Sequence, residues 1–449
     1  MPRWTIRRPR TAAGTVTAIL AVALGVTAVS GVLGGGPEAQ ADRTAQADRT
    51  AQTAQTQSRP AADPVTRAQR RVDLVPGDWR AWATLGTAHL ERGRVTGDPT
   101  SFARAEQAVR RSLALHPAEN GEALVARGAL ANARHDFAAA RADALAAIRF
   151  NAYDADAYAV LVDAETQLGR PAAATAAVQR LLDLRPGLSA YARASYDLEQ
   201  RGRAVQAAAL MRRALDTAVD PADVAFCRLQ LGDLAWHAGD LIGAGREYAA
   251  GLAADPASAG LQRGRARVAA ATGRLDSALA DYADLTSRAP LPGYLLEHAE
   301  LLRSAGRDAQ ATAQLELATA AHGVFSANGG TDGLTSAALA MAAGRPAEAV
   351  RAARAEWQRR QHADVADTLG WALHLAGEHA EAVGYARRAV GSGATYPEYA
   401  YHLGMIELAL GHPMAAREQL TAALAGNPQF SPVDVPLARG ALAGLGGAR

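Results

Sequence analysis

Residues 223–256 read DVAFCRLQLGDLAWHAGDLIGAGREYAAGLAADP and contain the pattern that decides the fold. An apolar run leads up to Gly239, and Ala244, Tyr248 and Leu252 then follow at four-residue steps until Pro256. Residues four apart share one face of a helix, and proline cannot continue a helix. This stretch therefore predicts two helices joined by a turn at Gly239, with the second helix ending at Pro256.

The turn glycine recurs along the chain at close to 34-residue spacing. The series is Gly169, Gly202, Gly239, Gly273, Gly306, Gly344, Gly377 and Gly411. A fixed period in this range is typical of stacked helix pairs rather than of one globular core.

Other features of the stretch recur in phase with these glycines. The Leu231-Gly232 pair returns as Leu369-Gly370 and Leu403-Gly404. Alanines early in the predicted second helices are Ala105, Ala140, Ala174, Ala207, Ala244, Ala278, Ala311, Ala349, Ala382 and Ala416, and the prolines that close these helices are Pro117, Pro186, Pro221, Pro256, Pro290 and Pro428. This pattern resembles the tetratricopeptide repeat, a family in which the Leu-Gly pair and the small residue of the second helix let neighbouring helices approach closely.

The resemblance implies an all-α fold, a right-handed α-solenoid of about ten helix-turn-helix repeats. We place the units at 79–120, 121–154, 155–187, 188–224, 225–258, 259–291, 292–329, 330–362, 363–396 and 397–430. The chain then divides into a signal peptide or transmembrane anchor over 1–41, a disordered Ala/Gln/Thr-rich linker over 42–63, repeats over 64–329 and 330–430, and a C-terminal cap or tail over 431–449.

Three departures from the pattern stand out. Unit one has extra residues near Arg94–Thr100, which we interpret as a turn insertion. Unit two has His135 where the others have the turn glycine. Unit seven ends at Gly323–Gly330, which we interpret as a glycine-rich loop and a possible hinge between two sub-arrays.

The first sixty residues predict export. Residues 11–33 carry no charge, follow several arginines, and are long enough to cross a bilayer. A cleaved signal ending at the small-x-small site Ala39-Gln40-Ala41 and an uncleaved anchor both fit this pattern. In either case the basic flank stays inside, so the repeats are expected on the extracytoplasmic side of the membrane.

Composition excludes several classes of function. The formal net charge is +2, which gives no electrostatic reason to expect a nucleic-acid partner. The chain has no lysine, and therefore no P-loop, pyridoxal-phosphate Schiff base or kinase lysine. Its single cysteine, Cys227, permits no internal disulfide and is expected to be buried. The eleven histidines form no metal-binding or catalytic motif, so we expect no cofactor, no metal site and no enzyme activity.

Function is therefore expected from a surface. In the tetratricopeptide family the first helices line a concave groove, and residue by residue this implies binding positions at Tyr196, Asp233, Trp236, Arg263, Arg267, Glu300, Arg303, Asp367, Trp371, His374, Tyr401 and Met405. Trp371 and Tyr401 occupy matching places in neighbouring units, where they either form an aromatic patch for a partner or fill gaps between helices. The Lys and Asn pattern with which some family members hold a peptide C-terminus is missing.

These observations favour a non-enzymatic scaffold that binds a protein or peptide in its groove. One alternative is an accessory or substrate-recruiting subunit of a cell-envelope enzyme or transport complex. A second is a structural spacer that associates with itself. The sequence does not identify the partner or the oligomeric state, and an uncleaved N-terminal segment would add a membrane contact.

Overall fold

The computed structural model describes residues 63–446. The expected leader or anchor, and the linker except for its last residue, lie outside the described residues. Within this range every regular element is an α-helix, and there are 22 of them. None of these helices is both long and apolar enough to span a membrane.

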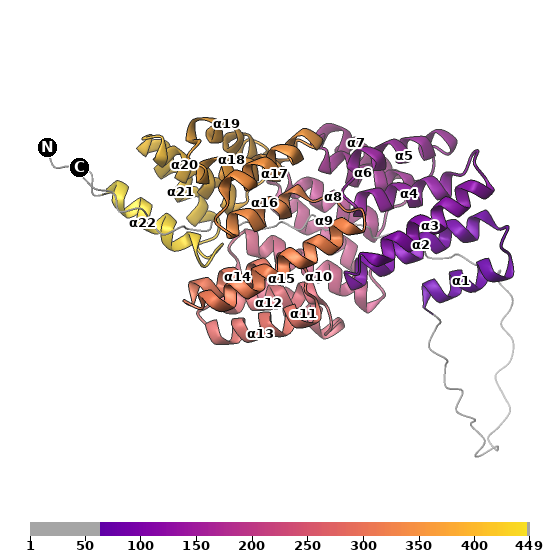
Figure 1. Ribbon diagram of the computed structural model, residues 1–449, viewed down its shortest axis with the longest axis horizontal. Helices are drawn as coiled ribbons and strands as arrows, with labels where there is room; N and C mark the ends of the chain where they lie inside the picture. The colour runs from indigo at the N-terminus through magenta and orange to yellow at the C-terminus, as the bar shows by residue number, and fades with distance from the viewer. Residues whose placement is uncertain (1–62, 447–449) are drawn as a thin grey trace, which may run out of the picture.

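Twenty of the helices form ten consecutive pairs (Figure 1), which confirms the predicted number of repeats. The pairs are α2 (Trp79–Thr96) with α3 (Thr100–Leu115), α4 (Gly121–Ala133) with α5 (Phe137–Phe150), α6 (Ala155–Gln167) with α7 (Pro171–Leu184), α8 (Leu188–Glu199) with α9 (Ala204–Asp216), α10 (Pro221–His237) with α11 (Leu241–Ala254), α12 (Ala259–Ala271) with α13 (Leu275–Arg288), α14 (Pro292–Ser304) with α15 (Asp308–Ala327), α16 (Gly333–Ala342) with α17 (Pro346–Arg359), α18 (Ala363–Leu375) with α19 (His379–Val390), and α20 (Pro397–Ala409) with α21 (Pro413–Gly426). A single helix α1 (Pro64–Leu74) precedes them, and α22 (Asp434–Gly446) follows.

Local sequence explains where the helices begin and end. The eight turn glycines have φ between 68° and 86°, the left-handed conformation that ends a helix and that glycine adopts without strain. An aspartate caps one of the helices that follow these glycines: the Asp240 side chain accepts a hydrogen bond from the Gly243 N–H at the start of α11. A cap of this kind stabilises a helix by about 1 kcal/mol.

The Leu-Gly pairs let the two helices of a unit approach closely. A Cβ atom on Gly232 would lie 2.3 Å from the Tyr248 ring, and one on Gly404 would lie 2.7 Å from the Leu420 Cγ. Any larger residue would push the helices apart, because protein interiors are packed without spare volume.

Three details of the predicted repeats are wrong. The expected loop at Gly323–Gly330 is mostly helix, because α15 continues through Ala327 and a glycine in a helix costs only about 1 kcal/mol. The residues around Arg94 likewise lengthen α2, which ends at Thr96, rather than form an inserted turn. Pro221 begins α10 instead of closing the preceding helix, since proline is well tolerated at the first helical position.

The array curves with its first helices on the inside. Most first helices contact the first helix of the next unit, as α4 contacts α6 and α18 contacts α20. In the described residues no comparable contact joins the second helices of successive units. The second helices therefore form the outer layer.

The curvature brings distant units together along a line of contacts that we call the seam. It joins the turns after α6, α8 and α10 to the loops after α17, α19 and α21. Side-chain hydrogen bonds link Gln167 with Arg360, Gln200 with Tyr396 and Trp236 with Asn427, pairs that are 193, 196 and 191 residues apart. This separation corresponds to between five and six units, so the seam joins successive turns of the superhelix.

Turn glycines in the seam differ from those outside it. A Cβ atom would lie 2.4 Å from the Gln361 carbonyl oxygen if placed on Gly169, and 2.7 Å from the Gly426 carbonyl oxygen if placed on Gly239. A Cβ atom on Gly377 or Gly411 would meet nothing within 4 Å. At these seam positions glycine is therefore required for two reasons: it adopts the positive φ angle without strain, and it has no side chain to meet the facing backbone.

Candidate functional site

The twelve predicted binding residues all lie on first helices, but the structure divides them into groups. Asp233, Trp236, Arg263, Arg267 and Glu300 come together on α10, α12 and α14, and we call them the Trp236 cluster. Asp367, Trp371, His374, Tyr401 and Met405 come together on α18 and α20, and we call them the Trp371 cluster. Tyr196 and Arg303 belong to neither group.

The Trp236 cluster is a layer of cations and aromatic rings. The Arg267 guanidinium carbon lies 4.3 Å from the centre of the Trp236 ring, a favourable cation–π arrangement. Only 8% of Arg267 and 3% of Trp236 is exposed. The Arg267 Nη1 and Trp236 Nε1 atoms are buried, and neither has a hydrogen-bond partner within the described residues.

Tyrosines hold the carboxylates of this region. The Tyr248 hydroxyl donates to Asp233 over 2.7 Å, and the Tyr282 hydroxyl donates to Glu297 over 2.8 Å. Burial and the neighbouring carboxylates raise the pKa of both tyrosines well above their usual range, so both remain hydrogen-bond donors. Glu297 also lies 3.3 Å from the Arg263 Nε.

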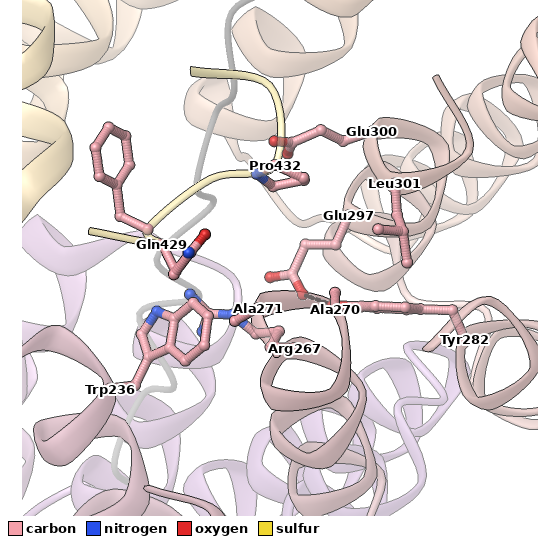
Figure 2. Close-up of a pocket in the computed structure, with 11 residues that line it drawn as sticks. Trp236, Arg267, Ala270, Ala271, Tyr282, Glu297, Glu300, Leu301, Gln429 and Pro432 are labelled. Carbon is pink, nitrogen blue, oxygen red and sulfur yellow. Dashed lines mark hydrogen bonds between the residues drawn. The ribbon is translucent and has the colours of Figure 1, made fainter. Parts of the chain in front are cut away.

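The chain itself crosses this face in a non-helical form that includes turns at 428–429 and 432–433. Residues 427–433, between α21 and α22, pass over the Trp236 cluster, and we call them the crossing segment (Figure 2). The fully buried Asn427 side chain donates to the Trp236 carbonyl oxygen over 2.8 Å, and the Ser431 hydroxyl donates to Glu300 over 2.8 Å. A cavity of about 80 Å³ remains between this segment and the cluster, lined by Trp236, Arg267 and Phe430 among others.

The Trp371 cluster is packed rather than open. Trp371 is 3% exposed and Tyr401 is 1% exposed. The Trp371 ring stacks on the rings of His374 and His402, with centroids 4.9 Å and 4.3 Å away. Of the two alternatives for these residues, the structure fits the filling of gaps between helices, because His402 stacks on Trp371 and Phe430 packs beside Tyr401.

Charges within the Trp371 cluster are paired across neighbouring units. The His402 Nδ1 lies 2.9 Å from both oxygens of Asp367. Burial opposes the charge of His402, but Asp367 outweighs it and raises the pKa of that histidine. Burial and, to a smaller extent, the positive charges of His379 and His402 together lower the pKa of His374 to about 4. Met405 packs at the edge of the same core.

The two remaining candidates, Arg303 and Tyr196, lie beside other parts of the array. The Arg303 Nη2 donates to the Ala342 carbonyl oxygen over 2.8 Å, which ties α14 to the end of α16. Tyr196 lies near the seam, where burial and the charges of Asp364 and Glu199 raise its pKa well above the usual range. Arg303 therefore joins neighbouring units, whereas the buried Tyr196 hydroxyl has no hydrogen-bond partner within the described residues.

Stacked helix pairs, close Leu-Gly contacts and left-handed turn glycines together decide the fold. It is a tetratricopeptide-type α-solenoid. In this solenoid the first-helix residues face the inside of the curve, where the crossing segment also lies.

Comparison with known proteins bears on the fold of this chain and does not identify its function. No protein-family model matches the chain, and the search of curated proteins finds no significant match. Among solved structures, the human IFIT1 dimer with m7Gppp-AAAA is 14% identical, covers 74% of this chain and 76% of its own, and has a TM-score of 0.48. Yeast Tom70 is 13% identical, with coverage of 79% and 87% and a TM-score of 0.42. A tetratricopeptide repeat protein from Parabacteroides merdae is 17% identical, with coverage of 57% and 98% and a TM-score of 0.34.

Two other expectations concern reactive groups. Cys227 is fully buried, as expected, and burial raises the pKa of its thiol to about 12. Such a thiol is present almost entirely in its unreactive protonated form near neutral pH. Between residues 63 and 446, no group of three or more histidine, cysteine, aspartate or glutamate side chains is arranged to hold a metal ion.

Sequence reasoning missed the crossing segment. Asn427-Pro428 was interpreted only as the end of the last repeat, and nothing local indicates that Asn427 reaches the Trp236 carbonyl. It also missed a larger cavity beside His135, although the substitution of histidine for the turn glycine marked that position.

Proposed function

We propose that this solenoid is a non-enzymatic interaction scaffold outside the cytoplasmic membrane. In this proposal it holds a non-helical segment of a partner protein against the Trp236 cluster. Stacked helix pairs of this kind form long concave surfaces suited to such binding. The proposed location rests on the uncharged N-terminal stretch and its basic flank.

The observation that carries the proposal is the crossing segment. It is a non-helical stretch of polypeptide that already lies on this face, with buried contacts from Asn427 and Ser431. The same contacts would serve a partner segment that takes its place. An intramolecular segment competes at an effective concentration in the millimolar range, so a partner must bind more tightly than the segment does.

Two unpartnered donors indicate what a partner would supply. Buried N–H groups without an acceptor are rare in proteins, and here the Arg267 Nη1 and the Trp236 Nε1 both lack one. Backbone carbonyl oxygens of a non-helical segment are suitable acceptors. The cavity of about 80 Å³ beside these donors has room for a small group such as a peptide unit.

A peptide-display experiment on the purified protein tests the proposal. Peptides selected on the wild-type chain should bind about tenfold more weakly to Arg267→Ala, because they lose a charge-assisted hydrogen bond. Trp236→Phe keeps the aromatic ring and removes only the Nε1 donor, so it should weaken binding by a smaller factor. The matched control is Arg265→Ala on the same helix, since Arg265 is half exposed and pairs with Asp281.

The outcomes separate clearly once circular dichroism has shown that the variants fold. If the selected peptides bind equally to wild type, Arg267→Ala and Arg265→Ala, the Trp236 cluster is not the binding surface. Failure to select any peptide, both on wild type and on an Asn427→Ala variant with a weakened crossing segment, would exclude the scaffold function at this site.

A separate experiment addresses the location. Protease added to intact cells or spheroplasts should cleave the repeats if they lie outside the cytoplasmic membrane. Repeats that remain protected until the membrane is dissolved would place them inside and contradict this part of the proposal.

A further inference from the structure

A second and much larger cavity lies between the first and second turns of the superhelix. Its volume is about 430 Å³, within the range of small-molecule sites. Its walls come from the end of α2, the α4–α5 turn, the α13–α14 loop, the end of α15 and the start of α16. Apolar side chains dominate the lining, including Phe102, Leu291, Val324, Phe325 and Leu334.

His135 contributes an imidazole to this cavity from an unusual backbone position. It occupies the turn between α4 and α5 with φ of 60°, the left-handed conformation that the turn glycines adopt in the later units. A residue with a side chain is strained in this conformation, and such strain is concentrated at functional sites. The imidazole packs beside the Phe137 and Phe325 rings, with centroids 5.4 Å and 5.6 Å away.

His135 and Asp332 form the polar end of the cavity. The His135 Nδ1 is buried, has no hydrogen-bond partner within the described residues, and lies 4.0 Å from the Asp332 Oδ2. That distance is too long for a hydrogen bond, but an oxygen atom placed between them could lie about 2.8 Å from each. Asp332 is held in place by the Thr335 hydroxyl and backbone N–H.

The charges around the cavity favour an uncharged ligand. Arg94 pairs with Glu91 over 2.9 Å, and Arg360 pairs with Glu356, so both arginines that line the cavity already have carboxylate partners. Burial also lowers the pKa of His135, which keeps the imidazole neutral near pH 7. Among residues 63–446, the arginines that line the cavity are thus already paired, which leaves neither of them free to hold an anion.

We propose that this cavity binds a small uncharged molecule with an apolar body and a hydroxyl group, and that the hydroxyl bridges His135 Nδ1 and Asp332 Oδ2. A hydroxyl suits this position because it can donate its single proton to the carboxylate while its oxygen accepts a hydrogen bond from the tautomer of His135 that carries the proton on Nδ1. At roughly 30 Å³ for each non-hydrogen atom, the volume of one water in the liquid, the cavity holds on the order of 14 such atoms. This site shares no residue with the Trp236 cluster and is independent of the proposed scaffold function.

Three probes that share the naphthalene ring test the proposal on the full chain: naphthalene, 2-naphthol and 2-naphthoate. Equilibrium dialysis measures the affinity of the protein for each of them. 2-Naphthol should bind about fivefold to tenfold more tightly than naphthalene, the effect of one hydrogen bond to buried groups. 2-Naphthoate should bind more weakly than 2-naphthol, since its charge would lie beside Asp332.

Two variants and one control tie the binding to the cavity. His135→Gly should bring the 2-naphthol affinity down to that of naphthalene, and its fold should be retained because glycine is the residue at this turn in eight other units. Ala321→Trp should fill the cavity and abolish binding of all three probes. His116→Ala, which alters a histidine outside the cavity, should change nothing.

The proposal is overturned if no probe binds, or if 2-naphthol binds no more tightly than naphthalene. It is equally overturned if His135→Gly leaves the ratio of the two affinities unchanged, or if Ala321→Trp binds the probes as wild type does. Circular dichroism and thermal unfolding of each variant separate these outcomes from a loss of fold.

Discussion

Gly202 lies directly against Gly393 across the seam. A Cβ atom on Gly202 would lie 2.4 Å from the Gly393 carbonyl oxygen, closer than real Cβ atoms approach any backbone atom. The two residues belong to the turn after α8 and the loop after α19, so this contact holds successive superhelical turns together.

Gly202→Ala is therefore expected to destabilise the protein more than Gly411→Ala. Both glycines have left-handed φ angles, 68° and 76°, so both substitutions include a strain of about 1–2 kcal/mol. Only Gly202 has a neighbouring backbone atom to displace, which adds about 1–3 kcal/mol of overpacking. Urea unfolding compares the two variants, and hydrogen exchange should become faster in α8 and the loop after α19 in Gly202→Ala alone. Equal loss of stability in both variants would show that the seam contributes nothing.

The comparison of these two glycines also shows what sequence can predict. Both follow a first helix and precede a second, so local periodicity identified each as a turn, and the helix pairs followed from it. Their different surroundings depend on a contact with a residue more than five units away, for which the sequence holds no local pattern. The seam could not be predicted for this reason.

The candidate site likewise has features that the sequence predicts and features that it does not. The repeat pattern placed Trp236 and Trp371 on first helices, where the structure has them. Their burial depends on what neighbouring segments contribute, which is His402 for Trp371 and the crossing segment for Trp236. Local spacing predicts the helix face of a residue, whereas exposure depends on tertiary packing.

Asn427→Ala should loosen the crossing segment. The Asn427 side chain is fully buried and is bonded to the Trp236 carbonyl oxygen over 2.8 Å. Loss of the amide removes this bond, although the carbonyl keeps the Gly239 N–H as a donor, so the free energy of unfolding is expected to fall by about 0.5–1.5 kcal/mol. Faster hydrogen exchange over residues 427–433 would locate the effect. Asn328→Ala removes a more exposed bond to Val324 and should cost less than 0.5 kcal/mol; a similar loss in both variants would contradict the assignment.

Glu356→Gln should be among the most destabilising single substitutions near the seam. Glu356 is 1% exposed, pairs with the buried Arg360, and thereby orients the Arg360 bond to Gln167 across the seam. Removing one charge of a buried pair leaves the other uncompensated, at a cost of about 3–5 kcal/mol. Chemical unfolding measures this loss. Glu381→Gln breaks an exposed pair with Arg354 and should cost less than about 1 kcal/mol, so a Glu356→Gln effect no larger than this would refute the role given to the buried pair.

His374→Phe should make the protein less sensitive to acid. Burial, together with the positive charges of His379 and His402, lowers the pKa of His374 to about 4 in the folded chain; in the unfolded chain the pKa is about 6.5. Between these values the unfolded chain binds more protons, so the stability contributed by His374 is complete above about pH 6.5 and is lost as the pH falls towards 4. The difference amounts to roughly 3 kcal/mol.

Phenylalanine keeps the ring that stacks on Trp371 and removes the titration, so the variant should lose correspondingly less free energy of unfolding between pH 7 and pH 4. The measurement is urea unfolding at a series of pH values in this range. His116→Phe, whose ring stacks on Trp79 far from the Trp371 cluster, provides the control and should follow the wild-type curve. If His374→Phe also follows that curve, the imidazole of His374 titrates equally in the folded and unfolded chains, and its burial beside Trp371 has no electrostatic consequence.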